Sequence, residues 1–182
     1  DPDSDRIGII VKEKNEYVFF NGNQLGCLLI DYFLKAMKAA GRMPQNPLVI
    51  KTIVTTDLQA DIARYYGADC EETLTGFKWI SRVPGIVFGY EEALGYCVDP
   101  DYVRDKDGIS AGSKLAALAA ALKAGDSNLG ELLNELAQKY GLHATSPLTI
   151  RVDDLSLIAK GMANLRAGGL TEIAGFPVVT AV

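Results

Sequence analysis

The sequence predicts an α/β domain of three layers, in which a mostly parallel or mixed sheet lies between helices. Short apolar and β-branched runs such as 48–55 have the composition of strands that are buried on both faces. Between these runs lie stretches with apolar residues at helical spacing, several of which end at a glycine. Strand and helix signals that alternate in this way are typical of a sheet covered by helices.

The elements are expected in a definite order along the chain. Residues 7–20 have the pattern of a hairpin, and 25–40 that of an amphipathic helix with Gly41 as its end. Residues 56–59 (Thr-Asp-Leu-Gln) have the pattern of a capping box. The other expected elements are a strand at 48–55, a short helix up to 66, strands at 70–74 and 85–89, a helix at 110–124, a second helix up to 140, a strand at 148–152, a helix at 154–167 and an apolar segment at 176–182.

We predict three segments from this order. Residues 1–21 form the tail of one domain, 22–142 form the α/β domain, and 143–182 begin a further domain. The last segment offers one helix and up to two strands, which is too little to bury a core by itself. The chain is therefore expected to be a piece of a longer protein.

Composition excludes several classes of function. Apolar residues make up 48% of the 182 residues and charged residues 23%, as in an ordinary folded protein. The net charge of −5 argues against a nucleic-acid partner, although a phosphorylated sugar needs only a local group of cations. No run of apolar residues is long enough for a membrane span.

Cysteine and histidine usage narrows the chemistry further. Cys27, Cys70 and Cys97 are odd in number and lack a CxxC spacing, so a disulfide framework or a zinc site is not expected. The reducing cytoplasm is the expected compartment. His143 is the only histidine, and its setting gives little support to a triad mechanism.

The first six residues, Asp-Pro-Asp-Ser-Asp-Arg, carry the clearest chemical signal. Asp1, Asp3 and Asp5 alternate, so their carboxylates can converge on one hard divalent cation such as Mg²⁺. Arg6 follows, and its guanidinium can hold a phosphate that touches the same metal. This grouping predicts phosphoryl transfer. The plain alternative is a solvated acidic terminus; an EF-hand is excluded because Arg6 and Lys12 occupy the positions of its glycine and bidentate glutamate.

Four segments in order now carry a family resemblance: the acidic loop at 1–6, Thr-Gly-Phe-Lys at 75–78, Tyr-Glu-Glu-Ala-Leu-Gly at 90–95 and Asp-Lys-Asp-Gly at 105–108. With these motifs the chain resembles the α-D-phosphohexomutases, the superfamily of phosphoglucomutases and phosphomannomutases. The resemblance covers the metal loop, the third domain and the start of the fourth. It implies a phosphoglucomutase domain 3-like fold.

The resemblance implies an enzyme that interconverts hexose 1-phosphate and hexose 6-phosphate through a phosphoserine and a sugar bisphosphate. Asp1, Asp3 and Asp5 are the implied ligands of Mg²⁺, which neutralises charge at the transferring phosphoryl group. Arg6 is the implied catalytic residue, as a partner of phosphate or phosphoserine.

Six further residues are implied to bind the substrate: Thr75, Gly76, Lys78, Glu91, Ala93 and Lys106. Glu91 is the expected reader of the sugar, because one carboxylate accepts hydrogen bonds from two vicinal hydroxyls. The alternatives are that Glu91 caps the next segment and that both lysines are ordinary solvated side chains. Trp79 can stack on a sugar face, but a single tryptophan beside an apolar residue is more often part of a core.

Departures from the family pattern leave alternatives open. Many relatives have a serine where this chain has Ala93, which favours glucose as the sugar and weakens a phosphomannomutase assignment. Phosphopentomutase specificity, a non-catalytic sugar-phosphate or cation-binding module, and a purely structural α/β domain are the other interpretations. The serine-bearing motif is absent, so the chain alone is expected to be inactive.

Overall fold

The computed structural model describes residues 2–146, 149–168 and 170–179, and it divides into two compact units, Asp1–Thr145 and Ser146–Val182. The first unit is built around a four-stranded sheet with the order β4-β3-β5-β6. Its strands are β3 (Leu48–Thr52), β4 (Asp69–Thr73), β5 (Ile86–Glu91) and β6 (Gly95–Cys97). The strands β4 and β5 pair in parallel with β3, and β6 pairs antiparallel with β5. The mostly parallel, mixed sheet is thus confirmed.

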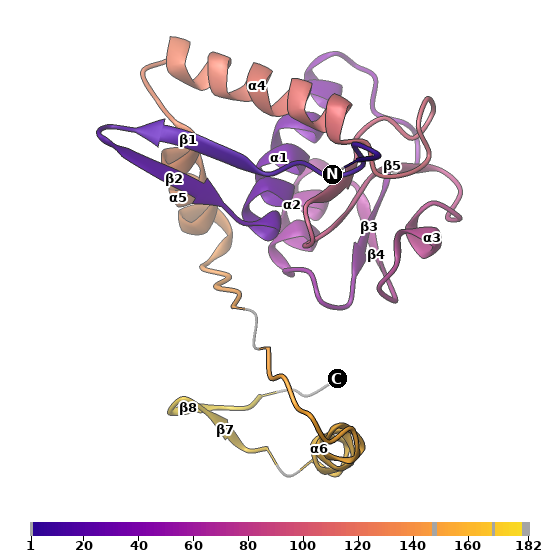
Figure 1. Cartoon of the computed structure of the whole chain (residues 1–182). Helices are drawn as coiled ribbons and strands as arrows, with labels where there is room; N and C mark the ends of the chain where they lie inside the picture. Colours follow the sequence, from indigo (N-terminus) through magenta and orange to yellow (C-terminus); the bar gives the residue numbers. More distant parts are fainter. Residues whose placement is uncertain (1, 147–148, 169, 180–182) are drawn as a thin grey trace. The chain divides into compact units, whose positions relative to one another are not determined.

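Helices cover both faces of this sheet, which confirms the three layers. The helices of the first unit are α1 (Gly22–Ala39), α2 (Leu58–Tyr66), α3 (Phe77–Ile80), α4 (Gly108–Ala124) and α5 (Leu129–Tyr140). Figure 1 shows α1 and α2 on one side of β3 and the short α3 on the other. Neighbouring residues of β3 belong to different cores, because successive side chains of a strand point to opposite faces. Val49 joins the larger cluster under α1, and Ile50 joins the cluster under α3.

The boundaries of α1 and α2 test the helix caps that the sequence predicts. Asn21 and Gln24 form a reciprocal capping box that begins α1, and Gly67, at φ 83°, ends α2 as expected. The capping box expected at 56–59 is wrong. Asp57 caps α2 without a side-chain hydrogen bond, and Gln59 Nε2 instead donates to the carbonyl of Ile50 at 3.0 Å.

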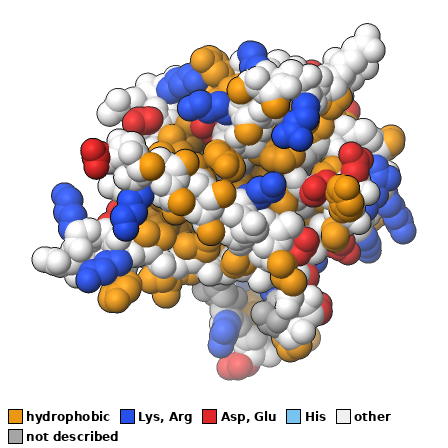
Figure 2. Space-filling model, turned by 90° about the horizontal axis from the view of Figure 1, so that it is seen from above, with side chains coloured by type: hydrophobic (Ala, Val, Ile, Leu, Met, Phe, Trp, Pro, Cys, Tyr) orange, Lys and Arg blue, Asp and Glu red, His pale blue; other side chains and the backbone are white. Residues whose placement is uncertain are grey.

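A two-stranded sheet precedes α1. The strands β1 (Ile9–Glu13) and β2 (Glu16–Phe20) pair antiparallel, as the hairpin pattern predicts. Their inward side chains pack on the larger core, whereas Ile10 and Phe19, which face each other across the pair, are exposed. Seen from the side of α4, apolar side chains gather on the surface between scattered lysines and arginines (Figure 2).

The second unit contains α6 (Ser156–Arg166) and a short hairpin of β7 (Glu172–Ile173) and β8 (Phe176–Pro177). The helix agrees with the expected one at 154–167. The strand expected at 148–152 does not form over 149–152, and Pro147 and Leu148 lie outside the described residues. In the part of this unit that the structure describes, no side chain is buried. The assignment of 1–21, 22–142 and 143–182 to domains of a longer protein stays a prediction.

Candidate functional site

The loops that follow the parallel strands meet at one edge of the sheet. Because β3, β4 and β5 run in the same direction, their carboxyl ends share this edge, which is where open α/β sheets bind ligands. The Thr-Gly-Phe-Lys loop at 75–78 follows β4, and the turn at 92–94 follows β5. The two loops touch, since Glu91 Oε1 accepts a hydrogen bond of 2.7 Å from the backbone N–H of Gly76. The structure therefore brings two of the four motifs together.

Within the loop at 75–78, each residue has a distinct setting. Gly76 has a φ of 109°, a conformation that favours glycine, and it is this backbone that presents its N–H to Glu91. Thr75 and Lys78 are exposed. The Lys78 ammonium lies 5.3 Å from the centroid of the Trp79 ring. Trp79 itself is 39% exposed, so it belongs to the surface beside this loop and not to the core.

The acidic loop docks on the same region through its backbone. Ile7 N donates to the carbonyl of Leu94 at 3.1 Å, and Gly108 N donates to the carbonyl of Ser4 at 3.0 Å. A Cβ at Gly108 would lie 2.7 Å from the carbonyl oxygens of Ser4 and Arg6, so only glycine allows this approach. The first and fourth motifs are thereby joined to the turn after β5.

Lys106 links the acidic loop to the hairpin of β5 and β6. Its ammonium lies 3.1 Å from Asp5 Oδ2, and 5.1 Å from the centroid of the Phe77 ring. Its stem lies against Gly95, where an added Cβ would come within 2.2 Å of Lys106 Cδ. The hydrogen bond from Lys106, and then its charge, lower the pKa of Asp5 below its ordinary value, so the carboxylate is ionised at neutral pH.

Two of the three expected metal ligands, Asp3 and Asp5, lie in the part of the chain that the structure describes. Asp5 Oδ1 is buried and pairs with Arg6, whose Nε lies 3.4 Å away. Asp3 is exposed, and Asp1 lies outside the described residues. Among the described residues no group of three or more metal-ligating side chains is present. Carboxylate oxygens are nevertheless the kind of ligand that a hard cation such as Mg²⁺ prefers, and the three-aspartate site stays a prediction.

Ala93 and Glu92 occupy the exposed tip of the turn after β5. Leu94 has a φ of 67°, and its carbonyl binds the acidic loop. Ala93 lies at the position where the resemblance places a sugar contact, and its methyl group offers no hydrogen-bonding group there.

A buried lysine supports the same edge of the sheet and was not singled out by the sequence analysis. Lys51 lies within the apolar run of β3, yet its ammonium is 3.1 Å from Asp57 Oδ1 and 2.6 Å from Glu72 Oε2. It also donates to the carbonyls of Thr52 and Thr55. Burial opposes the charge, but hydrogen bonds to the two carboxylates outweigh it and raise the pKa of Lys51. Phe77, Gly95 and Gly108 were also missed as site residues, because their roles arise from contacts between distant segments.

Comparisons with known proteins bear on this geometry. Residues 21–140 match the family model described as phosphoglucomutase/phosphomannomutase, alpha/beta/alpha domain III. The chain belongs to this family. It is 41% identical over 179 residues to a probable phosphomannomutase of Haemophilus influenzae, covering 98% of this chain and 36% of that protein. It is 31% identical over 189 aligned positions to a phosphoglucomutase of Staphylococcus aureus, covering 98% of this chain and 33% of that protein.

Solved structures agree with the family. A putative phosphomannomutase from Thermus thermophilus superposes with a TM-score of 0.61 at 26% identity, over 78% of this chain and 30% of that one. A phosphoglucomutase/phosphomannomutase family protein from Burkholderia thailandensis has a TM-score of 0.64 over 91% of this chain and 31% of that one, and at 18% identity it shows the fold alone. The chain spans about a third of the length of the curated relatives described above.

Proposed function

We propose that the chain is the sugar-recognition part of a Mg²⁺-dependent phosphohexomutase that interconverts hexose 1-phosphate and hexose 6-phosphate. The observation that carries the proposal is Lys106. Its ammonium binds Asp5 in the acidic loop, while its stem packs on Gly95 at the end of the loop that carries Glu91. A metal loop and a sugar-reading loop that share one lysine suit phosphoryl transfer to a sugar hydroxyl.

The reaction implied by the family is a double transfer. A phosphoserine outside this chain gives its phosphoryl group to a sugar hydroxyl. The serine P–O bond breaks, a sugar P–O bond forms, and the proton of the hydroxyl ends on the serine oxygen. The bisphosphate then returns its other phosphoryl group to the serine. Mg²⁺ held by Asp1, Asp3 and Asp5 supplies positive charge beside the transferring group when it is bound.

The chain's own residues bind and orient the sugar phosphate. Gly76 N–H uses one lone pair of Glu91 Oε1 and fixes the carboxylate, which leaves Oε2 to accept hydrogen bonds from vicinal hydroxyls. Lys106 has donors beyond the one directed at Asp5 and can turn them to a hydroxyl or phosphate. Lys78 and Arg6 are the proposed phosphate partners, and Thr75 supplies a hydroxyl at the exposed loop.

Glucose is the proposed sugar, and mannose is the second candidate. The alanine at position 93 removes a hydroxyl donor that many relatives have, which favours a phosphoglucomutase. The relative with 41% identity is named a probable phosphomannomutase, whereas the phosphoglucomutase relative is 31% identical. Epimers differ in a few hydrogen bonds, each worth about 1–3 kcal/mol when left unmade, so the choice is decided by an assay.

The test is a coupled mutase assay on the full-length parent protein with Mg²⁺ and a trace of sugar bisphosphate. It compares glucose 1-phosphate, mannose 1-phosphate and ribose 1-phosphate at equal concentration. We expect Glu91→Gln to lower kcat/KM about 100-fold, because the amide keeps the acceptor for Gly76 N–H but replaces an acceptor for sugar hydroxyls by a donor. Glu92→Gln is the matched control, since Glu92 is the exposed neighbour, and it is expected to leave the rate within about twofold.

Other outcomes would change the proposal. Turnover that collapses in Asp3→Asn supports the metal loop, whereas turnover that persists removes it from the mechanism. Equal rates for both Glu91→Gln and Glu92→Gln would make Glu91 a structural cap. No turnover on any of the three sugars would favour a non-catalytic sugar-phosphate or cation-binding module. The 182-residue chain alone is expected to show no mutase activity, because the serine-bearing motif is not in it.

A further inference from the structure

The first turn of α1 supports the strand that ends at Glu91, and Asn23 makes the hydrogen bonds. Asn23 Oδ1 accepts from the Tyr90 hydroxyl at 3.0 Å and from Thr56 N at 3.1 Å. Tyr90 is fully buried and directly precedes Glu91. Its ring lies so close to Gly26 that a Cβ there would be 2.5 Å from Tyr90 Cζ. A buried hydroxyl needs an acceptor, so the Asn23 amide ties the end of this strand to the first turn of α1.

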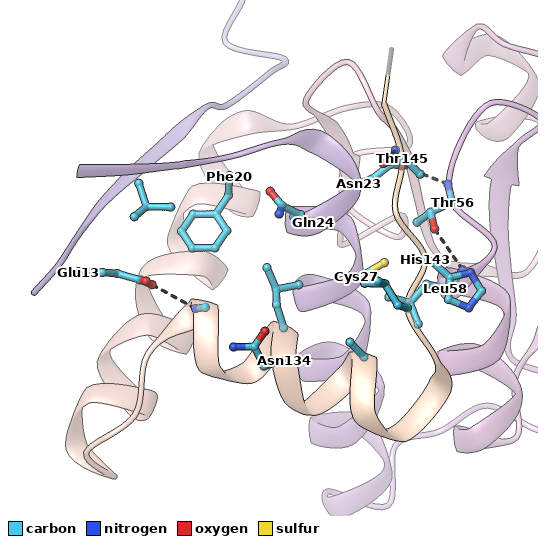
Figure 3. Close-up of a pocket in the computed structure, with 15 residues that line it drawn as sticks. Glu13, Phe20, Asn23, Gln24, Cys27, Thr56, Leu58, Asn134, His143 and Thr145 are labelled. Carbon is cyan, nitrogen blue, oxygen red and sulfur yellow. Dashed lines mark hydrogen bonds between the residues drawn. The ribbon is translucent and has the colours of Figure 1, made fainter. Parts of the chain in front are cut away.

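The other end of the same amide binds a different segment. Asn23 Nδ2 donates to Thr145 Oγ1 at 3.2 Å, and Thr145 is the last residue of the first compact unit. We name residues 142–145 the exit segment. A second contact holds it, because His143 Nε2 lies 3.3 Å from Asp61 Oδ2 in α2. Figure 3 shows Thr145, Asn23 and Thr56 next to one another, with His143 beside Leu58.

The exit segment also lines a cavity of about 350 Å³ between the hairpin β1–β2, α1 and α5. None of its lining residues is a lysine or arginine, so a phosphate group finds neither of these cations there. Burial raises the pKa of Cys27, which lines the cavity, to about 12, so its thiol stays protonated at neutral pH. No residue of the loops at 75–78 and 92–95 lines this cavity, so it is distinct from the place where those two loops meet.

We propose that Asn23 is a positioning residue that couples the sugar-reading strand at Glu91 to the docking of the exit segment. The inference rests on the proposed function for the role of Glu91. A planar amide cannot move its oxygen toward Tyr90 without moving its nitrogen relative to Thr145. Coupling between binding events is reciprocal, so a change at the exit segment alters sugar binding and a change at Tyr90 alters the exit segment.

The first experiment uses no sugar. In the full-length protein, the rate of protease cleavage within 142–145 is followed by mass spectrometry in Tyr90→Phe and Tyr96→Phe. Both variants remove one hydroxyl from a buried ring, but that of Tyr96 donates to the carbonyl of Gly22 at 3.3 Å and not to Asn23. We expect Tyr90→Phe to speed cleavage about fivefold and Tyr96→Phe to leave it unchanged. Equal rates in both variants would overturn the coupling.

The second experiment breaks the bond to the exit segment from either side. Asn23→Ala removes the amide and with it the bonds to Tyr90 and to Thr145, and Thr145→Val removes only the hydroxyl. Each is expected to raise KM for glucose 1-phosphate about fivefold with kcat unchanged, because the loss is one of ground-state binding. The double variant is expected to be no worse than Asn23→Ala alone. A merely structural role would give effects that multiply, or a loss of kcat as well, and either result contradicts the proposal.

Failure of the proposed function and failure of the proposed coupling give different results in these experiments. If Glu91→Gln leaves kcat/KM unchanged, the proposed role of Glu91 fails, yet the cleavage rates of Tyr90→Phe and Tyr96→Phe still decide the coupling. If Glu91→Gln raises KM while Thr145→Val does not, the function stands and the coupling is wrong. Thermal unfolding of each variant shows that the compared proteins are folded.

Discussion

The two compact units of this chain use the same kinds of residues with different results. In the first unit α1 buries a continuous side, and Leu25, Leu28, Leu29 and Leu34 are inaccessible to solvent or nearly so. In the second unit α6 carries a comparable apolar set, yet Leu157 remains 49% exposed and Ile158 55% exposed. Both are amphipathic helices. The difference is that α1 packs on α2 and on a sheet, whereas the described part of the second unit offers only a two-stranded hairpin.

This comparison teaches that helical periodicity predicts a helix but not a core. Burial of apolar area needs a second layer of sufficient size, and small units lack it. The functional motifs follow the same division, because all four lie in the first unit, where loops are fixed by a packed sheet.

The largest expected difference between the units comes from removing a leucine in each. Leu28→Ala in α1 is expected to lower the free energy of unfolding by about 2–5 kcal/mol, since the side chain is fully buried. Leu157→Ala in α6 is expected to cost less than about 0.5 kcal/mol, since half of that side chain already meets water. Urea denaturation of the 182-residue chain measures both. Similar losses would mean that α6 is buried as deeply as α1.

A glycine within each helix gives a second, smaller contrast. Gly26→Ala places a Cβ 2.5 Å from the Tyr90 ring in a packed core, and we expect a loss of about 1–3 kcal/mol in thermal unfolding. Gly161→Ala meets no atom within 4 Å. It is expected to favour α6 by about 0.5–1 kcal/mol through helix propensity, seen as increased helical circular dichroism. A stabilising Gly26→Ala would show that the core has room there.

The smallest effect concerns a buried carboxyl in α1. Asp31 is 6% exposed, and its Oδ1 accepts from the Tyr66 hydroxyl at 2.9 Å. Burial raises the pKa of Asp31 above its ordinary 3.8; the charges of Lys35 and Lys139 oppose this shift and that of Glu135 adds to it. Between the ordinary and the raised pKa the folded protein binds more protons, so this group's contribution to stability falls as pH rises through that window.

Asp31→Asn keeps the acceptor for Tyr66 and removes the titration. As pH rises from about 4 to 7, we expect the free energy of unfolding of the variant to increase relative to that of the parent chain, by up to about 1 kcal/mol. Urea titrations across this range measure it. Asp154, in the second unit, is the matched control because its pKa is shifted in the opposite direction. Hydrogen bonds from Ser156 lower the pKa of Asp154, so the stability that this carboxylate contributes is lost as pH falls. A pH-independent difference for Asp31→Asn would contradict the assignment.

Much of the fold was predictable, and the errors have physical causes. The hairpin, α1 and the parallel strands follow from local periodicity and from caps such as Asn21. The capping box at 56–59 failed because the Gln59 side chain is buried in the tertiary structure, where it donates to the carbonyl of Ile50. The strand expected at 148–152 failed over 149–152, where a β-branched run has no neighbouring strand with which to pair.

The sequence by itself determined the residue types of the site: the acidic loop, the glycine of the loop at 75–78, Glu91 and Lys106. Only the tertiary structure decided which of them meet. Gly76 binds Glu91, Lys106 binds Asp5, and Gly108 admits the backbone of Ser4. These contacts join segments that are far apart in the chain, so they depend on strand order and on close approach of backbones, neither of which local periodicity encodes.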